Sequence, residues 1–164
     1  MSDGSLTIRA ARPGEAALAL QFLRELAEYE KLTHEMEASE AMIDAALFGP
    51  QAQLSCEFAE WDGETVGFAM WLLNFSTFSG RAGMFLEDLF VRPAFRGRGI
   101  GKALMAHLAR KCVENGWSRL QWEVLDWNTP SIEFYKSLGA VMMNEWIGVR
   151  LSGDALARLA KANA

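Results

Sequence analysis

The sequence predicts a single α+β domain. Stretches with apolar residues at helical spacing alternate with short apolar runs that are typical of strands. Asp62-Gly63 lies between two such runs and is a strong signal for a hairpin turn. The 164 residues contain neither an internal repeat nor a linker, and this length suits one domain with a sizeable core. We therefore expect residues 1–164 to form one domain.

The N-terminal half should begin with a strand at residues 6–10. A helix over residues 14–31 should follow, because apolar residues recur along one of its sides, at Leu18, Phe22, Leu26 and Tyr29. A second helix is expected over residues 33–48, where Gly49-Pro50 would end it. Strands over residues 53–61 and 64–75 would form the two arms of the hairpin.

The C-terminal half should contain a polar loop at residues 76–83, an apolar strand at 84–91 and a helix at 100–115. Asn115-Gly116 is a typical end for that helix. The remaining expected elements are a strand at 119–125, a short helix between a cap at Asn128 and Gly139, a pair of strands within 140–151, and a helix at 154–161.

The chain is organised around a basic, glycine-rich turn between the strand at 84–91 and the helix that begins at Ile100. Its glycines let the chain turn tightly and let a ligand approach the backbone. The first amides of the helix lack intrahelical partners and favour an anion, and the basic side chains add to this preference. The turn therefore predicts a phosphate or pyrophosphate site. Its glycines are Gly97, Gly99 and Gly101, and its basic residues are Arg92, Arg96, Arg98 and Lys102.

Two common nucleotide motifs do not match this turn. A dinucleotide fingerprint requires G-x-G-x-x-G after the first strand, but here single residues separate the three glycines and the turn comes late in the chain. A Walker loop requires four residues before Gly-Lys and then Ser or Thr. Only three residues separate Gly97 from Gly101, and Ala103 follows Lys102. Both interpretations fail on spacing.

The string Arg96-Gly97-Arg98-Gly99-Ile100-Gly101 resembles the pyrophosphate loop of the GCN5-related N-acetyltransferases, the GNAT family. The segments R-E-L-A-E-Y-E-K-L, V-G-F-A-M and D-W-N-T-P-S-I-E-F-Y-K-S-L-G extend this resemblance over nearly the whole chain. They are similar to the diamine acetyltransferase branch, spermidine/spermine and especially thialysine N-acetyltransferases. The resemblance implies a mixed, mostly antiparallel central sheet flanked by helices, acetyl-CoA as co-substrate, and a homodimer.

The resemblance also implies roles for individual residues. Glu87 would be the general base, directly or through water, and Tyr135 the acid that protonates the thiolate of CoA. Glu87, Tyr29, Glu30 and Asp88 would line the amine site. The cofactor would be bound by Leu89, Phe90 and Val91, by the turn residues Arg96, Gly97, Arg98, Gly99, Ile100, Gly101 and Lys102, and by Asn128 and Ser131. Asn128 could equally act only as the N-terminal cap of the short helix that follows it.

The net charge of −5 conceals a strong asymmetry along the chain. Residues 25–64 contain eleven acidic residues and one basic residue, whereas residues 92–119 contain seven basic residues and one acidic residue. The acidic segment would attract a small cationic amine and the basic segment a phosphorylated ligand. Because the positive segment coincides with a compact loop, we expect no nucleic-acid partner.

Other partners and sites are excluded or left open as follows. No apolar run reaches the length of a membrane span, so we expect no membrane partner. The N-terminus lacks the apolar core of a signal peptide and the two cysteines form no disulfide framework, so we expect a reduced, cytoplasmic location. His34 and His107 have no third ligand at metal spacing, so no metal is expected. Cys56 and Cys112 are expected to be buried structural thiols.

Three alternatives to a thialysine- or lysine-specific enzyme remain. The first is a polyamine acetyltransferase, although the Asp-Pro-Trp segment that the polyamine enzyme carries is absent from residues 76–81. The second is a transferase that acts on protein lysines or N-termini. The third is a non-catalytic acyl-CoA-binding module, which would keep the glycine turn and lose Glu87 or Tyr135; both residues are present here.

Overall fold

A computed structural model describes residues 4–162, which divide into two compact units at Leu125 and Asp126. The first unit contains a five-stranded sheet in the order β1-β2-β3-β4-β5. Its strands pair antiparallel except for β4 and β5, which are parallel, so the sheet is mixed and mostly antiparallel as expected. The strands are β1 Leu6–Ala10, β2 Ser55–Trp61, β3 Glu64–Ser76, β4 Arg81–Val91 and β5 Leu120–Trp122.

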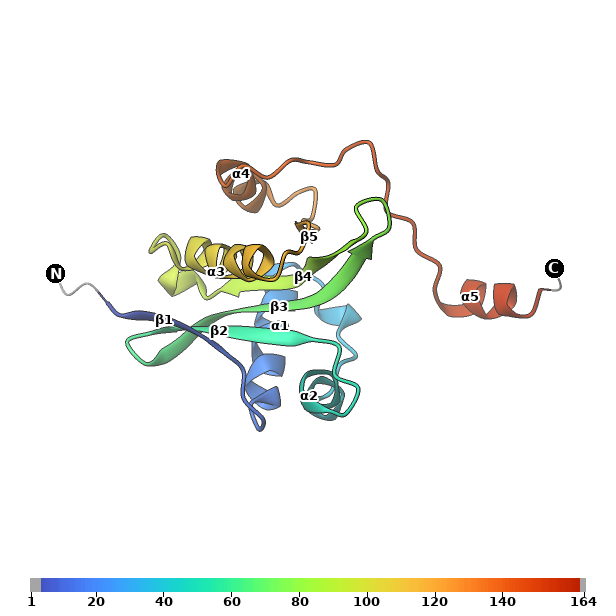
Figure 1. Ribbon diagram of the computed structural model, residues 1–164. Helices are drawn as coiled ribbons and strands as arrows, with labels where there is room; N and C mark the ends of the chain where they lie inside the picture. Colours follow the sequence, from blue (N-terminus) through green and yellow to red (C-terminus); the bar gives the residue numbers. More distant parts are fainter. Residues whose placement is uncertain (1–3, 163–164) are drawn as a thin grey trace. The chain divides into compact units, whose positions relative to one another are not determined.

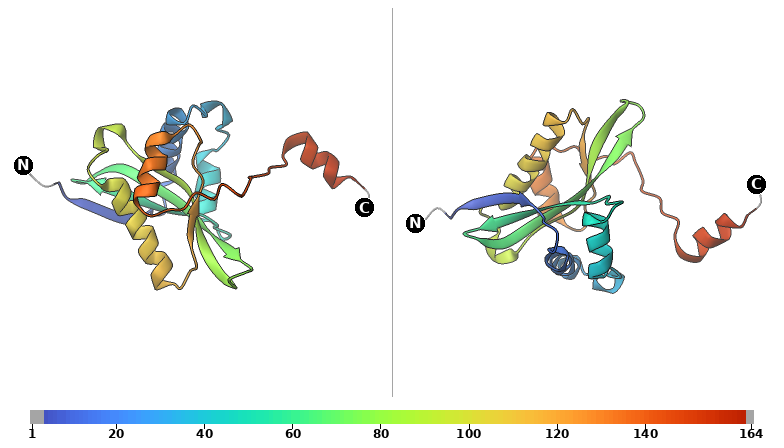
Figure 2. Two further views of the ribbon diagram at one scale, coloured as in Figure 1. Left: turned by 90° about the horizontal axis from the view of Figure 1, so that it is seen from above. Right: turned by 60° about the horizontal axis from the view of Figure 1, so that its bottom comes forward.

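Helices cover both faces of this sheet (Figures 1 and 2). Helices α1 (Ala16–Tyr29) and α2 (Glu40–Phe48) lie over one face, and α3 (Ile100–Glu114) lies over the other. The first face carries an aromatic core in which Phe22 of α1 packs against Phe58 and Phe68, with ring centroids 6.1 and 5.5 Å apart. All three side chains are fully buried. Burial of these apolar side chains provides the main force that holds α1 on the sheet.

The predicted helix at residues 33–48 is wrong in its first half. Residues Thr33–Glu35 form a short 3₁₀ helix, and α2 begins only at Glu40. Ser39 interrupts the helix because its hydroxyl accepts a hydrogen bond from the Met42 amide, at 3.3 Å, and thereby caps the start of α2. Apolar periodicity does not show such a break, since the apolar spacing continues across it.

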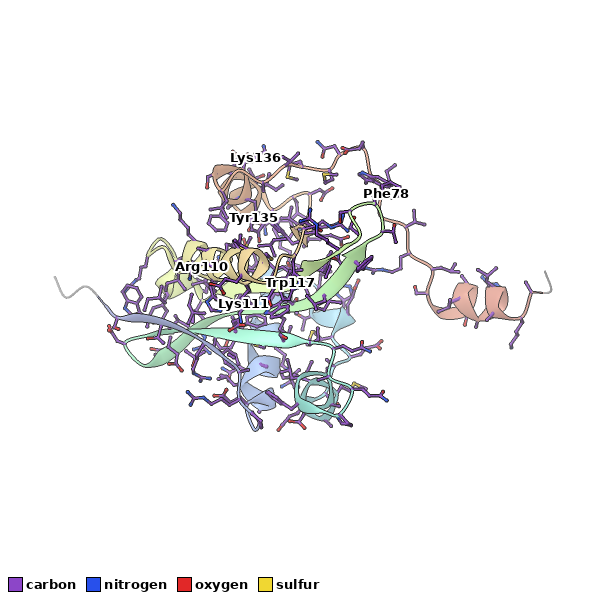
Figure 3. The ribbon with its side chains drawn as sticks, viewed as in Figure 1. Phe78, Arg110, Lys111, Trp117, Tyr135 and Lys136 are labelled. Carbon is purple, nitrogen blue, oxygen red and sulfur yellow. The ribbon has the colours of Figure 1, made fainter. Side chains whose placement is uncertain are left out.

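The predicted loop at residues 76–83 is also shorter in the structure. β3 continues to Ser76 and β4 begins at Arg81, so only residues 77–80 turn between the strands. The two strands form a long hairpin that carries Phe78 at its exposed tip (Figure 3). The polar composition of this segment suggested a loop, but outer hairpin arms that face solvent on both sides are polar as well.

The second unit contains α4 (Thr129–Ser137) and α5 (Gly153–Ala160). The prediction of a strand pair within residues 140–151 is wrong, since this segment contains neither helix nor strand. Ile147, Val149 and Leu151 alternate as in a strand, yet all three are exposed. Alternation creates a strand only when a neighbouring strand accepts its backbone hydrogen bonds, which a sequence pattern cannot show.

The strand predicted at residues 119–125 is present as β5, but it is shorter than expected and covers only three residues. Among residues 4–162, no helix combines the length and the apolar character that a membrane span requires.

Candidate active site

An irregularity in β4 determines where the candidate catalytic carboxylates lie. Asp88 pairs with Met70 of β3, but the next residue of β3, Trp71, pairs with Leu86. Glu87 is therefore an extra residue on β4, as in a β-bulge. A regular strand would place Glu87 and Asp88 on opposite faces; the bulge removes this simple alternation. Glu87 is exposed and Asp88 is partly buried.

Asp88 lies on the face of the sheet that α1 covers. Its partner Met70 belongs to the core cluster of that face, and directly opposite residues of paired strands project to the same side. On the next strand, Cys56 pairs with Met70 and belongs to the same cluster. Cys56, Met70 and Asp88 thus form a row of cross-strand neighbours, in which Asp88 is the only charged residue. Two residues further along β4, Phe90 packs against Tyr29 of α1, with ring centroids 6.4 Å apart.

Glu30 is held near this row by the way α1 ends. Lys31 adopts a left-handed conformation with φ 61°. Its amide donates to the Glu28 carbonyl at 3.1 Å, and the Leu32 amide donates to the Ala27 carbonyl at 2.8 Å. These two bonds form the usual left-handed helix end. They fix Glu30 at the C-terminal cap of the helix, one residue after Tyr29.

The three acidic residues act on one another electrostatically. Burial raises the pKa of Asp88 to about 7, and the negative charges of Glu87 and Glu30 add to the shift. Burial also raises the pKa of Glu30. The structure therefore brings together, in the first unit, the three carboxylates that the sequence predicts for the amine site.

A cavity lies between α1 and the end of β4, and its lining does not include these three carboxylates. Its volume is about 340 Å³, and its lining combines aromatic rings with acidic side chains. The lining residues are Glu25, Glu28, Tyr29, Phe90 and Pro93. The sequence prediction missed Glu28. Its position one residue before Tyr29, in a segment with the spacing of E-x-x-E-Y-E, could have indicated that it shares the exposed side of α1.

The glycine turn leaves its backbone open, as the sequence predicts. Gly97 and Gly99 have φ 76° and 80°, conformations that favour glycine. A Cβ atom at either position would meet no protein atom within 4 Å. Gly99 is the N-terminal cap of α3 and no side chain caps that end. The first amides of α3 are consequently available to an anion, and the residues present fit a pyrophosphate group.

Two arginines of the turn, Arg96 and Arg98, stack on aromatic rings. The Arg96 guanidinium lies 4.6 Å from the centre of the Tyr29 ring, and its Nε donates to the Val91 carbonyl at 2.8 Å. The Arg98 guanidinium lies 5.4 Å from the rings of Trp61 and Phe95. Stacking leaves guanidinium edges free for hydrogen bonds, and it joins the turn to the end of α1 through Tyr29.

One edge of β4 is open next to the turn. β5 pairs with β4 only from Met84 to Leu86. Within residues 4–162, no strand continues this pairing toward Leu89 and Val91, although both still pair with β3 on the other side. An extended ligand can add to such an edge as a further strand.

In the second unit, Asn128, Ser131 and Tyr135 come together around α4. Asn128 caps the helix, since its Oδ1 accepts a hydrogen bond from the Ser131 amide at 3.4 Å. Tyr135 is buried, and its ring centroid lies 5.3 Å from that of Phe134. Both interpretations of Asn128 therefore stay open, because a cap can also present its amide to a ligand.

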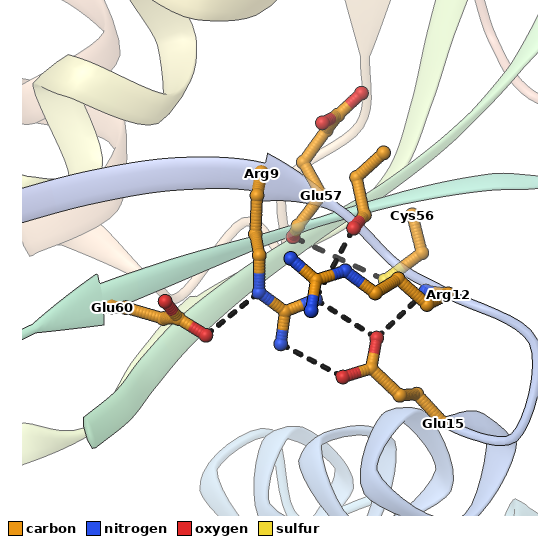
Figure 4. A network of polar contacts seen from close by, with 7 residues as sticks. Arg9, Arg12, Glu15, Cys56, Glu57 and Glu60 are labelled. Atoms are coloured by element: carbon orange, nitrogen blue, oxygen red, sulfur yellow. Dashed lines mark hydrogen bonds and ion pairs between the residues drawn. The ribbon is translucent and has the colours of Figure 1, made fainter. Parts of the chain in front are cut away.

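The polar network around β1 and β2 is structural (Figure 4). The Arg9 guanidinium donates to Glu15 at 2.8 and 2.9 Å and to Glu60 at 2.7 Å, which joins β1 to α1 and β2. The hydrogen bond from Arg9 lowers the pKa of Glu15. These charges lie away from the glycine turn in sequence and bind one another.

Glu57 forms a second polar cluster, which the sequence did not reveal. It is only 2% exposed and lies 3.3 Å from Nε2 of His107 and 3.2 Å from Nζ of Lys111. Lys111 also lies over the Trp71 ring, which packs against Trp117 (Figure 3). A buried charge requires such partners, and the cluster fixes α3 on the sheet.

The surroundings of the two cysteines bear on whether either could act as a nucleophile. Cys56 and Cys112 are buried, and burial raises the pKa of both thiols, which disfavours a thiolate nucleophile. In the part of the chain that the structure describes, no three His, Cys, Asp or Glu side chains are grouped for metal binding.

Comparison with known proteins identifies the family. The model of the acetyltransferase (GNAT) family matches residues 19–140. A thialysine N-epsilon-acetyltransferase of Sus scrofa is 36% identical over 95% of this chain and 98% of its own length. The solved structure of an integron cassette protein from the mobile metagenome of V. cholerae has a TM-score of 0.80 and 30% identity, and the match covers 96% of this chain and 99% of that one.

A further solved structure shows the same fold with a ligand. An aminoglycoside N-acetyltransferase in complex with CoA has a TM-score of 0.70 at 22% identity, with 90% of this chain and 95% of that chain covered. The open glycine turn, the five-stranded mixed sheet and the family match agree with one another. The chain belongs to the GNAT family and is an N-acetyltransferase.

Proposed function

We propose that this enzyme transfers the acetyl group of acetyl-CoA to a primary amine of a small cationic acceptor, a thialysine- or lysine-like amino acid or a diamine. One observation carries the proposal: a single unit contains both a helix start, that of α3, which no side chain caps, and a group of three carboxylates near the end of α1. The first suits the pyrophosphate of CoA and the second suits an ammonium group.

Acetyl-CoA would bind mainly through backbone groups. The pyrophosphate would accept hydrogen bonds from the amides of the segment Arg96–Lys102, and the edges of the stacked guanidinium groups would add charge. The pantetheine arm would pair with the open edge of β4 at Leu89 and Val91, beside Phe90. The resemblance also assigns cofactor binding to Asn128 and Ser131.

The transfer requires a neutral amine, a polarised thioester and a protonated leaving group. A carboxylate of β4 would accept the proton of the ammonium group; the resemblance assigns this role to Glu87. The Leu89 amide would donate to the acetyl carbonyl. Tyr135 would protonate the departing thiolate. A direct transfer in a ternary complex agrees with the raised pKa of both thiols, which disfavours an acetyl-cysteine intermediate.

The acceptor would lie against the end of α1. Tyr29, Glu30 and Asp88 would contact the reacting amine, and Glu28, in the lining of the cavity, would face the far end of the molecule. Two cationic ends separated by an aliphatic chain match acidic groups around aromatic rings. We also propose a cytoplasmic location and a homodimer.

A panel of acceptors tests this proposal. We expect release of CoA from acetyl-CoA to be fastest with thialysine, lysine or ornithine, slower with spermidine, and slowest with a lysine-containing peptide. Thiol release is measured with a colorimetric reagent, and mass spectrometry identifies the acetylated nitrogen. Transfer to the peptide alone would support the protein-modifying alternative and overturn the proposal.

A further inference from the structure

We infer that Asp88, and not Glu87, accepts the proton that the acceptor amine loses. This inference rests on the proposed acetyl transfer and names the base within it. It departs from the family resemblance, and it follows from the positions of the two side chains on an irregular strand.

The bulge in β4 gives the two neighbouring carboxylates different surroundings. Asp88 keeps its partner on β3, Met70, and so projects to the face that α1 covers. Glu87 is the extra residue without a partner on β3, and its side chain is exposed. A proton acceptor must be enclosed with the substrate, and of the two residues Asp88 is the one that faces the end of α1.

The surroundings of Asp88 are mostly apolar. Met70 and Cys56 are at most 4% exposed, and Phe90 on the same face is buried against Tyr29. Among residues 4–162, no side chain forms a hydrogen bond or ion pair with the Asp88 carboxylate. A carboxylate with mostly apolar neighbours favours a cationic partner, because the loss of hydration without a compensating partner is costly. An ammonium group supplies that partner.

The charges that face Asp88 are negative. Glu87 lies on its own strand and Glu30 at the end of α1, and both raise its pKa. Of the nearby cations, Arg92 is bound to Glu25 and Arg96 stacks on Tyr29. Together with burial, these groups bring the pKa of Asp88 to about 7. A general base is most effective when its pKa lies near the working pH.

The proton and electron balance is as follows. The Asp88 carboxylate takes one proton from R–NH₃⁺, which gives R–NH₂ and a carboxylic acid. The nitrogen lone pair then forms the C–N bond with the thioester carbon, and the C–S bond breaks with its electron pair on sulfur. Tyr135, the acid that the resemblance implies, donates its proton to that thiolate. The nitrogen loses its second proton to solvent as the amide forms, and Tyr135 regains one proton from solvent. Asp88 releases its proton to solvent, so one proton is produced in each turnover.

The pH dependence of kcat/KM distinguishes the two carboxylates. In the wild type we expect kcat/KM for thialysine to fall as the pH drops through about 7, the pKa of Asp88. Asp88→Asn should abolish this acidic limb and lower kcat roughly 10²-fold. Glu87→Gln should retain the limb and move it to lower pH, because removal of a negative neighbour lowers the pKa of Asp88. Glu30→Gln should move it in the same direction.

The reverse pattern would overturn the inference: loss of the acidic limb in Glu87→Gln and only a shift of the limb in Asp88→Asn.

A direct measurement of protonation, which does not depend on turnover, completes the test. Carbon-13 NMR of labelled aspartate should show one carboxyl group that titrates near pH 7 in the wild type, and this titration should be missing from Asp88→Asn. If the wild type lacks that titration, the inference is also contradicted. Binding of acetyl-CoA to Asp88→Asn, measured by calorimetry, should be retained. If the wild type transfers acetyl to no amine of the panel, the proposed function itself fails.

Discussion

Arg92 and Glu25 form a bidentate ion pair that joins the end of β4 to α1. Nε and Nη2 of the arginine each lie 2.9 Å from a carboxylate oxygen. The guanidinium carbon also lies 4.6 Å from the centre of the Phe22 ring. Arg92 precedes the glycine turn in sequence, where its charge suggested a phosphate contact, but the structure uses it to fix α1 beside the turn.

Replacement of Arg92 with alanine should lower the free energy of unfolding by roughly 1.5–3 kcal/mol at pH 7, the usual range for hydrogen bonds between charged groups. The hydrogen bond from Arg92 lowers the pKa of Glu25. A group with a lowered pKa stabilises the fold above its unfolded pKa, and this contribution disappears as the pH falls through the folded value. The difference between wild type and variant should therefore shrink below about pH 4.

Urea unfolding at pH 7 and at pH 3 measures both parts of this prediction. Arg110→Ala is a matched control, since Arg110 is exposed on α3 (Figure 3) and surface substitutions usually change stability by about 0.5 kcal/mol or less. Equal effects of the two substitutions would show that the ion pair adds nothing to stability.

Gly99→Val should weaken acetyl-CoA binding at least about tenfold, which corresponds to roughly 1.4 kcal/mol. The added Cβ meets no protein atom within 4 Å outside its chain neighbours, so the side chain would project into open space, where we propose that the pyrophosphate binds. Valine also strains a backbone with φ 80°. Gly14→Val controls for that strain, because Gly14 has φ 94° and equally open surroundings outside the turn. Calorimetry of both variants measures the affinity; comparable losses would contradict the assignment of the turn.

Tyr135→Phe should reduce kcat roughly 10²-fold, the usual scale for a general acid, and leave acetyl-CoA affinity nearly unchanged. The substitution removes one hydroxyl group and retains the ring that packs against Phe134. Thermal unfolding should confirm that the variant is folded. A turnover within about twofold of the wild type would make Tyr135 a core residue only.

Glu30→Gln should raise KM for a dicationic amine more than it lowers kcat, the pattern expected when an interaction shared by the ground state and transition state is lost. The effect should diminish at higher salt, because the attraction is screened. Glu37→Gln removes a charge from the same acidic segment at an exposed position and should leave KM nearly unchanged. If both variants behave alike, the acidic segment acts as a diffuse field rather than through Glu30.

Local signals predicted the parts of the fold that local chemistry determines. Asp62 and Gly63 both have positive φ, 50° and 82°, as the hairpin signal requires, and the glycine turn opens into α3 as its pattern indicates. The bulge at Glu87 depends instead on the register between two strands. The buried Glu57 depends on a helix fifty residues later in the chain, which supplies His107 and Lys111. Single-sequence patterns contain neither kind of information.

The last prediction concerns assembly. Apolar side chains that a soluble chain leaves exposed in a contiguous segment usually indicate a contact surface. Residues 141–151 contain such a segment, and its exposed members are Val141, Met143, Trp146, Ile147, Val149 and Leu151. The alternation of the last three suits a strand that lacks a neighbour, and a second copy of the chain can provide that neighbour.

We therefore expect the mass of a dimer in light scattering at micromolar concentration. Replacement of both Trp146 and Ile147 with serine should shift the protein toward the monomer, because it removes two of the largest exposed apolar side chains of the segment. Val113→Ser is the control, since Val113 is also exposed and apolar but lies on α3 in the first unit. A monomer mass for the wild type would contradict the prediction. A dimer mass that the double substitution does not change would place the contact elsewhere on the chain.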